Sequence, residues 1–449
     1  RALGRAPRSG TAVAALTVVL GLTASACASG ASGAASAVAP RYGVGTRVIT
    51  VTDTSRPTAA NGPVAGHPGR TLVVTILYPA AGRPGLRPEP GTPADRRGAP
   101  YPLIVFAHGF GSAPHEYEPL LAHWAAAGFV VAAPRFPLTN SATAGGPDLA
   151  DYVNQPADMS FVVSQVLTQS AAAGSWMSGL ADPSAVAAAG HSLGGVTTLG
   201  LVANTCCSDP RIDAAVVMAG DPVTFPTGTV RYPRIPLLFV HGSGDKTVPY
   251  AASVTAFDAA YPPKVLLTIT GGGHSSPVDP GGPAFDDVVR STVDFFDAYL
   301  RHQGAAAGRL SGDSKSGATT VALALHAGDR VRVPVPKTVT GKLSATASPD
   351  SGLADGQRVT VSWKGYQPGT SINILECSAP VTGPQNCNLS TATVGQPDPV
   401  GSGFTSFVVH TGPVGTGTCD AGHRCVIVVN QGGSTSTSAS VLLPVSFAG

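Results

Sequence analysis

Gly190-His191-Ser192-Leu193-Gly194-Gly195 is the stretch of this sequence that says most about its fold. It contains a full G-x-S-x-G match, follows a predicted buried strand at 185–189 and opens a predicted helix. A sharp strand-to-helix turn exposes the Ser192 hydroxyl at the carboxyl edge of a sheet, and the flanking glycines let the strained backbone pass without a Cβ clash. We therefore predict that Ser192 is a nucleophile; the alternative is that it merely caps the helix.

On both sides of this turn, residues 41 to about 305 alternate short apolar runs with longer amphipathic runs, which is typical of a mostly parallel sheet covered by helices. Eight runs predict strands, the first two antiparallel: 47–51, 71–78, 103–107, 129–133, 185–189, 214–218, 237–240 and 265–270. The clearest helical patterns are 117–127, 158–169, the stretch after Ser192, and 285–300. The prediction is an α/β domain with an eight-stranded sheet.

Ser192 requires a base that takes its proton, since a serine hydroxyl is a poor nucleophile at neutral pH. His274 follows the last predicted strand and the glycine run 271–273, a flexible loop that can bring its ring over the nucleophile. His191 flanks the nucleophile and His241 is expected to pack at a strand end. We predict that His274 is the base.

The base in turn requires an acid that holds it in the right tautomer. Asp245 lies in a polar turn just past the predicted strand 237–240, which is the position for this acid; alternatively, it only shapes the turn. Asp221 and Asp258 are weaker candidates by their placement. The chain order Ser, Asp, His is that of α/β-hydrolases, so we predict a triad of Ser192, Asp245 and His274.

The oxyanion of an acyl-transfer intermediate needs two hydrogen-bond donors. The N–H of Leu193, the residue after the nucleophile, supplies one by position, and the Phe110 N–H in the turn after strand 103–107 is the candidate for the other. The alternative for Phe110 is a tight βα turn without such a role. Apolar residues near the predicted sheet-edge loops are candidates for pocket walls or for core packing: Phe110, Tyr117, Phe136, Trp176 and Met177.

Residues 41 to about 305 resemble the secreted α/β-hydrolases grouped around dienelactone-hydrolase-like, platelet-activating-factor-acetylhydrolase-like and cutinase-like esterases. The stretches that carry the resemblance are Tyr78-Pro79, His108-Gly109-Phe110-Gly111, Gly128-Phe129-Val130-Val131, Asn154-Gln155-Pro156-Ala157-Asp158, the turn around Ser192, and Gly244-Asp245. It implies the α/β-hydrolase fold, cleavage of carboxylic esters, and an oxyanion hole of Phe110 and Leu193. No metal or organic cofactor is expected. True dienelactone hydrolases use Cys in place of Ser192, and polyester-cleaving relatives usually carry Met in place of Leu193, so the substrate prediction stops at the ester class.

Past residue 300 the composition changes. Residues 304–329 mix small and polar residues with a weak helical pattern, which we interpret as the tail of a hydrolase domain spanning 41–329, and a Pro-containing linker follows at 330–340. From 341 to 449, short alternating runs rich in Ser, Thr, Val and Gly predict an antiparallel β-sandwich. Its cysteines are too far apart for paired CxxC zinc spacings, so disulfides are predicted rather than a metal site. The adjacent Cys206 and Cys207 receive no assignment.

This C-terminal segment resembles the neocarzinostatin-type apoproteins, which are immunoglobulin-like seven-stranded sandwiches. The resemblance is carried by the cysteine spacing and by Ser348-Pro349-Asp350-Ser351-Gly352-Leu353, Asp355-Gly356 and Tyr366-Gln367-Pro368-Gly369-Thr370. It implies pairing of Cys377 with Cys387 and of Cys419 with Cys425, each contributing about 2 to 3 kcal/mol. Some members bind enediyne chromophores, a property that is not carried over to this chain.

The N-terminal residues 1–27 have the pattern of an export signal. Arg1, Arg5 and Arg8 precede an apolar run at 12–22 that is too short to cross a bilayer, and small residues at 24–26 precede Cys27. The pattern resembles a bacterial lipobox, which implies a lipid on Cys27; the alternative is ordinary signal cleavage. Residues 28–40 predict a flexible tether. We expect a secreted or cell-surface protein that contacts the membrane only through its lipid.

Composition narrows the function classes. The 449 residues carry 28 Lys and Arg against 26 Asp and Glu, a net charge of +2, which provides no electrostatic footprint for nucleic acid. We expect a small or polymeric ester as substrate and no obligate protein partner. Two other functions stay open: a hydrolase-fold surface protein without turnover, and sequestration of a small molecule by the C-terminal sandwich.

Overall fold

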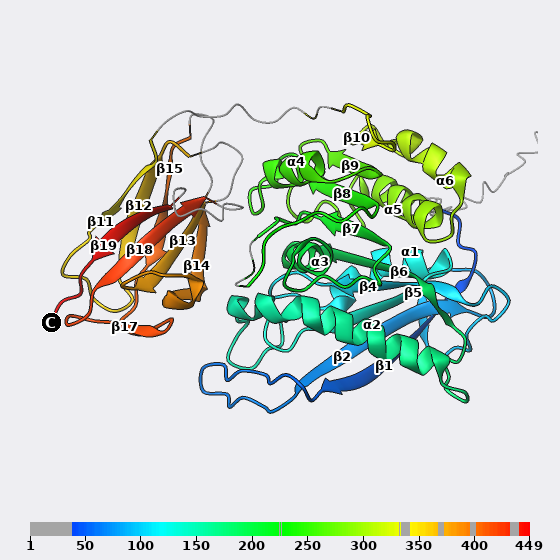
Figure 1. Ribbon diagram of the computed structural model, residues 1–449, viewed down its shortest axis with the longest axis horizontal. Coiled ribbons are helices and arrows are strands. Elements are labelled where there is room, and N and C mark those ends of the chain that lie inside the picture. Colours follow the sequence, from blue (N-terminus) through cyan, green and yellow to red (C-terminus); the bar gives the residue numbers. More distant parts are fainter. Residues whose placement is uncertain are drawn as a thin grey trace, which may run out of the picture. The chain divides into compact units, whose positions relative to one another are not determined.

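The computed structural model describes residues 38–223, 225, 227–331, 333, 342–366, 372–395, 401–431 and 440–449. These residues form an α/β domain and an all-β domain, each with its own apolar core (Figure 1). The predicted export signal with Cys27, nearly all of the predicted tether and most of the predicted linker lie outside the described residues. At the two ends of the α/β domain, Val38, Val331 and Val333 pack against its cores.

The α/β domain is built on one mixed sheet in the order β10-β9-β8-β7-β6-β4-β5-β2-β1-β3. Its strands are β1 (Gly43–Asp53), β2 (Arg70–Ala80), β3 (Pro88–Pro90), β4 (Tyr101–Ala107), β5 (Val130–Arg135), β6 (Ala181–His191), β7 (Ala214–Met218), β8 (Leu237–Gly242), β9 (Lys264–Ile269) and β10 (Thr319–Ala324). Strands β5, β4, β6, β7, β8 and β9 run parallel to one another, whereas β2 is antiparallel to β1 and β5, and β10 is antiparallel to β9.

Each of the eight predicted runs falls on an observed strand, and the first two form the predicted antiparallel pair. Two strands were not predicted, β3 and β10. Strand β10 lies in the segment 304–329 that we interpreted as a weakly helical tail, and it pairs antiparallel with β9, Thr319 opposite Ile269. The run of small residues in β10 is too weak a pattern to predict a strand from the sequence. The strand forms because the open edge of β9 provides hydrogen-bond partners for it.

Helices cover both faces of this sheet (Figure 1). They are η1 (Pro114–Tyr117), α1 (Glu118–Ala126), η2 (Leu149–Asn154), α2 (Gln155–Ala171), α3 (Leu193–Ala203), α4 (Tyr250–Ala259), α5 (Phe285–Tyr299), α6 (Gly304–Arg309) and η3 (Leu310–Gly312). Successive β4 residues alternate between the two cores: Ile104 and Phe106 pack with α1 and α5, and Leu103 and Val105 pack with α2, α3 and α4. This burial on both faces explains why the parallel strands read as continuous apolar runs.

A buried ionic cluster fixes the start of α2 against β2. The Arg70 guanidinium donates to Asp158 at 2.8 Å and to Asp151 at 2.9 Å, and all three side chains are buried. Such a pair is costly to break because an uncompensated charge would remain in the core. One turn earlier, Gln155 donates to the Thr139 hydroxyl at 2.7 Å, which holds the loop after β5 near the carboxyl edge of the sheet.

In its described residues, the C-terminal domain is a sandwich of seven strands with a small extra ribbon. One sheet has the order β11 (Ser344–Ser348), β12 (Arg358–Lys364), β15 (Gly403–Val408), and the other β14 (Cys387–Gly395), β13 (Ile372–Ser378), β18 (Cys425–Gln431), β19 (Ser440–Val445). The ribbon consists of β16 (Gly412–Val414) and β17 (Gly417–Cys419), and a short η4 (Pro384–Asn386) precedes β14. Trp363, Tyr366, Ile374 and Ile427 lie in the core between the sheets.

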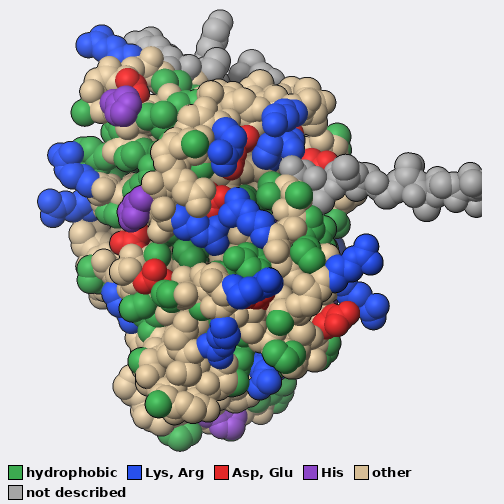
Figure 2. All heavy atoms as spheres, turned by 90° about the vertical axis from the view of Figure 1, so that its right-hand side faces the viewer, with side chains coloured by type: hydrophobic (Ala, Val, Ile, Leu, Met, Phe, Trp, Pro, Cys, Tyr) green, Lys and Arg blue, Asp and Glu red, His purple; other side chains and the backbone are tan. Residues whose placement is uncertain are grey.

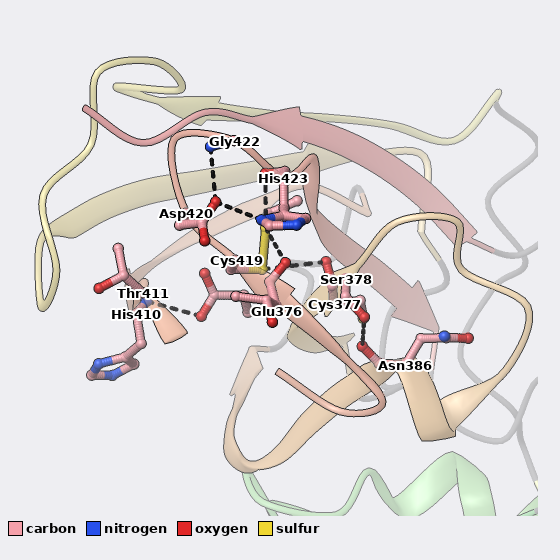
Figure 3. Close-up of a disulfide and its surroundings, with 12 residues drawn as sticks. Glu376, Cys377, Ser378, Asn386, His410, Thr411, Cys419, Asp420, Gly422 and His423 are labelled. Carbon is pink, nitrogen blue, oxygen red and sulfur yellow. Dashed lines mark hydrogen bonds and ion pairs between the residues drawn. A yellow bond between two sulfur atoms is a disulfide. The ribbon is translucent and has the colours of Figure 1, made fainter. Parts of the chain in front are cut away.

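Two disulfides match the pairs implied by the resemblance: Cys377 with Cys387, which links β13 to β14, and Cys419 with Cys425, which links the ribbon strand β17 to β18 (the latter in Figure 3). Beside them the fully buried Glu376 carboxylate accepts the His410 N–H at 2.9 Å, and its other oxygen has no partner within the described residues. Burial raises the pKa of Glu376 to about 7. In the α/β domain, Cys206 and Cys207 form a third disulfide.

The surface carries dispersed charge. On the face shown in Figure 2, Lys and Arg side chains are interspersed with hydrophobic and uncharged ones. Among the described helices, none is long and apolar enough to cross a membrane. In the same residues, no three His, Cys, Asp or Glu side chains are grouped so that they could hold a metal ion.

Candidate active site

Ser192 occupies a strained turn between β6 and α3. Its backbone has φ +58° and ψ −122°, a conformation that a residue with a side chain rarely adopts. A Cβ on Gly190 would lie 2.1 Å from the Gly194 carbonyl oxygen, and one on Gly194 would lie 2.0 Å from that of Ala107, so both flanking glycines are required by close backbone crossings. The Ser192 side chain makes no capping hydrogen bond to α3. Ser192 therefore occupies the N-cap position of α3 without capping the helix through its side chain.

The three side chains expected to act together form one hydrogen-bonded chain. The Ser192 Oγ lies 2.8 Å from His274 Nε2, and His274 Nδ1 lies 2.7 Å from Asp245 Oδ2. Ser192 follows β6, Asp245 follows β8 and His274 follows β9, so the three residues meet at the carboxyl edge of parallel strands. The chain has the atoms and the order needed to move a proton from a hydroxyl to an imidazole.

Asp245 is held as an acceptor on both oxygens. Its Oδ1 accepts the backbone N–H groups of Thr247 at 2.7 Å and Val248 at 3.0 Å, while Oδ2 faces His274 and His241. Burial by itself raises the pKa of Asp245, but the hydrogen bonds from His241, His274 and the Thr247 N–H outweigh it, so the pKa lies well below its usual range. The carboxylate is thus ionised throughout the neutral range.

His241 is part of this arrangement, although the sequence suggested only packing at a strand end. Its Nε2 lies 3.1 Å from Asp245 Oδ2 and 2.9 Å from the Val248 carbonyl oxygen. Both atoms are acceptors, so Nε2 carries the proton, and Nδ1 faces the Ser253 hydroxyl at 2.7 Å. The signal that could have revealed it is the spacing of four residues between this histidine and the acid in one turn.

The turn expected to hold Phe110 as an oxyanion donor lies against the nucleophile. A Cβ on Gly109 would stand 3.3 Å from the Ser192 Cβ. The Gly109 carbonyl accepts from His108 Nδ1 at 2.8 Å and from the Ser112 N–H at 3.3 Å, and the Gly111 N–H donates to the Thr139 carbonyl at 2.8 Å.

The Phe110 N–H lies between the hydrogen-bonded Gly109 carbonyl and Gly111 N–H, but has itself no acceptor within the described residues. The Leu193 N–H is the first of α3 and has no acceptor inside the helix. Neither N–H group predicted as an oxyanion donor is therefore engaged in a hydrogen bond within the described residues.

Most of the suggested pocket-wall residues belong to the core. Phe136 and Met177 are fully buried, and Trp176 packs on Tyr78 with ring centroids 5.1 Å apart. Phe110 differs, because 42% of it is exposed.

Comparisons with known proteins divide the chain in the same way. Residues 91–249, which include Ser192 and Asp245 but end before His274, match the chlorophyllase family, and residues 345–447 match the neocarzinostatin family. A solved ferulic acid esterase from Streptomyces cinnamoneus is similar at 20% identity and a TM-score of 0.46, over 60% of this chain and 93% of that chain.

Curated relatives match the C-terminal segment. They are the antitumor antibiotic C-1027 apoprotein and actinoxanthin of Streptomyces globisporus, 45% and 44% identical, each over 16% of this chain. The chain spans about half the length of these two relatives, 52% and 49%. Apokedarcidin of an actinomycete is 37% identical over 20% of this chain and 88% of its own length.

Proposed function

The chain belongs, through residues 345–447, to the neocarzinostatin family and joins that module to a chlorophyllase-type hydrolase domain, and from this premise we propose that it is a serine hydrolase of carboxylic esters. The observation that carries the proposal is the hydrogen-bonded chain from Ser192 Oγ through His274 to Asp245, at 2.8 and 2.7 Å. The free backbone donors at Phe110 and Leu193 support it.

In the proposed first step, the ester carbonyl lies between Ser192 Oγ and the two backbone donors. His274 Nε2 accepts the hydroxyl proton as Ser192 Oγ bonds to the carbonyl carbon, and the Phe110 and Leu193 N–H groups stabilise the oxygen that becomes negative. The imidazolium then gives the proton to the leaving alcohol. The ionised Asp245 stabilises the charge that forms on His274.

In the second step a water molecule takes the place of the alcohol. His274 accepts a proton from this water, whose oxygen attacks the acyl-enzyme carbonyl, and the same two donors stabilise the second oxyanion. Collapse releases the carboxylic acid and returns the proton to Ser192. Each residue therefore acts twice.

We also propose that the enzyme is exported and that the C-terminal module is an accessory binding domain. Three disulfides support export, since disulfides persist in oxidising compartments outside the cytosol. The described residues of the candidate site all come from the α/β domain, at positions up to 274, which supports an accessory role for the sandwich.

Labelling with a fluorophosphonate probe tests the function, because covalent capture of Ser192 requires an activated hydroxyl whereas mere binding does not. Wild type should be labelled and should hydrolyse short nitrophenyl esters, while Ser192→Ala and His274→Ala should lose both properties and stay folded by circular dichroism. Ser184→Ala and His67→Ala, both exposed in the same domain, are the matched controls.

An unlabelled, inactive but folded wild type would leave the surface protein or the sequestering protein as the better reading. Wild-type turnover in either site variant would end the triad proposal.

A further inference from the structure

We propose that Tyr117 and His191 form a positioning relay that ties the turn carrying the predicted oxyanion donor to the loop carrying the base His274. The inference rests on the proposed esterase function and adds two residues to it. Tyr117 and His191 hydrogen-bond to backbone groups of the site rather than to the side-chain atoms proposed to react, so both are positioning residues rather than catalytic ones.

The relay is a continuous chain of hydrogen bonds. The Gly109 N–H lies 3.0 Å from the Tyr117 hydroxyl, this hydroxyl lies 3.2 Å from His191 Nδ1, and His191 Nε2 lies 2.9 Å from the His274 backbone carbonyl. All members except the loop of His274 are buried. The rings also pack on one another, with centroids 5.8 Å apart for Tyr117 and His191 and 5.0 Å for His191 and His274.

In each hydrogen bond of the relay, the chemistry of the two groups determines which one donates. A backbone carbonyl can only accept, so His191 Nε2 carries a proton and donates to His274. Burial lowers the pKa of His191 to about 4, so at pH 7 the ring is neutral and Nδ1 accepts. Burial also raises the pKa of Tyr117, whose phenol therefore keeps its proton and donates it to Nδ1.

The Gly109 N–H then donates to the remaining lone pair of the Tyr117 oxygen, which completes the chain without an unsatisfied group. The buried Ser112 hydroxyl makes no hydrogen bond of standard geometry within the described residues, but it lies close enough to the Tyr117 hydroxyl to lower the pKa of this phenol against the larger effect of burial.

His191 connects three parts of the site: the nucleophile, the base and the turn that carries the predicted oxyanion donor. His191 is the residue before Ser192 at the end of β6, and the relay connects it to Gly109 on one side and to His274 on the other. The glycine at 109 lets the Tyr117 hydroxyl approach closely, because a Cβ there would stand only 3.0 Å from it. Nucleophile, base and oxyanion donor must be aligned together for the transition state, and small misplacements are costly.

Removing the relay should therefore lower kcat and leave KM nearly unchanged. Tyr117→Phe removes a single oxygen, and His191→Phe keeps an aromatic ring while removing both hydrogen bonds. The matched control is Tyr78→Phe, which loses a buried tyrosine hydrogen bond to the Thr92 carbonyl at 2.7 Å on β2, away from the site.

The experiment is a double-mutant cycle on nitrophenyl ester hydrolysis by the full chain. We expect kcat to fall about 10- to 100-fold in Tyr117→Phe and in His191→Phe, with KM within about 2-fold, and the double variant to be no worse than the slower single one. His191→Gln, whose amide can still donate to the His274 carbonyl, should retain more activity than His191→Phe. Tyr78→Phe should keep the wild-type kcat.

Equal rates for Tyr117→Phe and Tyr78→Phe, or losses that multiply in the double variant, would overturn the relay while leaving an active wild type and the proposed function intact. An inactive wild type would instead overturn the proposed function. If His191→Phe does not fold, the comparison of Tyr117→Phe with Tyr78→Phe decides the question.

Discussion

Replacing Asp245 by Asn probes the candidate site most directly, because the amide has nearly the shape of the carboxylate but only one acceptor. Asp245 accepts from the Thr247 and Val248 N–H groups on one oxygen and faces His274 and His241 on the other. Whichever way the amide of Asn is turned, its NH₂ group faces two of these donors.

The structure indicates which orientation Asn takes. Backbone N–H groups cannot change from donor to acceptor, and leaving them unpaired costs about 1 to 3 kcal/mol each. Histidine can change tautomer, so the NH₂ group should turn toward His274, whose Nδ1 then accepts and whose Nε2 carries the proton. That tautomer points a hydrogen at Ser192 and cannot take its proton. The same replacement in serine proteases lowers kcat on the order of 10⁴-fold, or about 5.4 kcal/mol at 1.36 kcal/mol per tenfold.

The assay is kcat for nitrophenyl butyrate, together with the rate of fluorophosphonate labelling. Asp221→Asn and Asp258→Asn are the controls, since both aspartates were candidates for the acid. Burial raises the pKa of Asp221 to about 6, which makes it a poor permanent anion, and Asp258 lies in α4. Full activity of Asp245→Asn, with loss in either control, would show that the acid is misassigned.

Three further outcomes follow from the two domains and the N-terminus. Burial raises the pKa of Glu376 to about 7, so the folded sandwich keeps a proton that the unfolded chain loses, and the stability of the sandwich should fall as pH rises from about 4.5 to about 7. In thermal unfolding of residues 342–449, Glu376→Gln should reduce this dependence of stability on pH. An unchanged pH dependence would contradict the prediction. A chain ending after Val333 should keep kcat/KM on soluble nitrophenyl esters and lose rate only on insoluble esters, where a second binding module raises effective concentration; a folded truncation with a reduced rate on soluble esters would mean that the sandwich helps to build the site. Wild type should partition into detergent and Cys27→Ser into the aqueous phase, whereas a wholly aqueous wild type would rule out the lipid.

The turn around Ser192 was predictable from six consecutive residues because they contain the glycines that the turn needs. The crossing that excludes a Cβ at Gly190 is local, against the Gly194 carbonyl, whereas the one at Gly194 is against the Ala107 carbonyl on β4 and appears only in the tertiary structure. The buried parallel strands were predictable for a related reason, since burial on both faces demands continuous apolar runs. Strand β10 shows the limit: its small residues have no strong pattern, and pairing with β9 is what makes it a strand.

The sequence alone thus determined the type of fold, the two modules and the residues that are candidates for a triad. Only the tertiary structure decided how they meet, because Ser192 and His274 are 82 residues apart, and Asp245 and His274 are 29 apart. The hydrogen bonds of His191, His241 and Tyr117 likewise appear only in the tertiary structure; the sequence marked His191 as a flanking residue, His241 as a packing residue, and Tyr117 as a candidate for a pocket wall or for core packing. A hydrogen bond is defined by distance and direction between atoms, and for residues on different strands these follow from strand order and register, which no local pattern encodes.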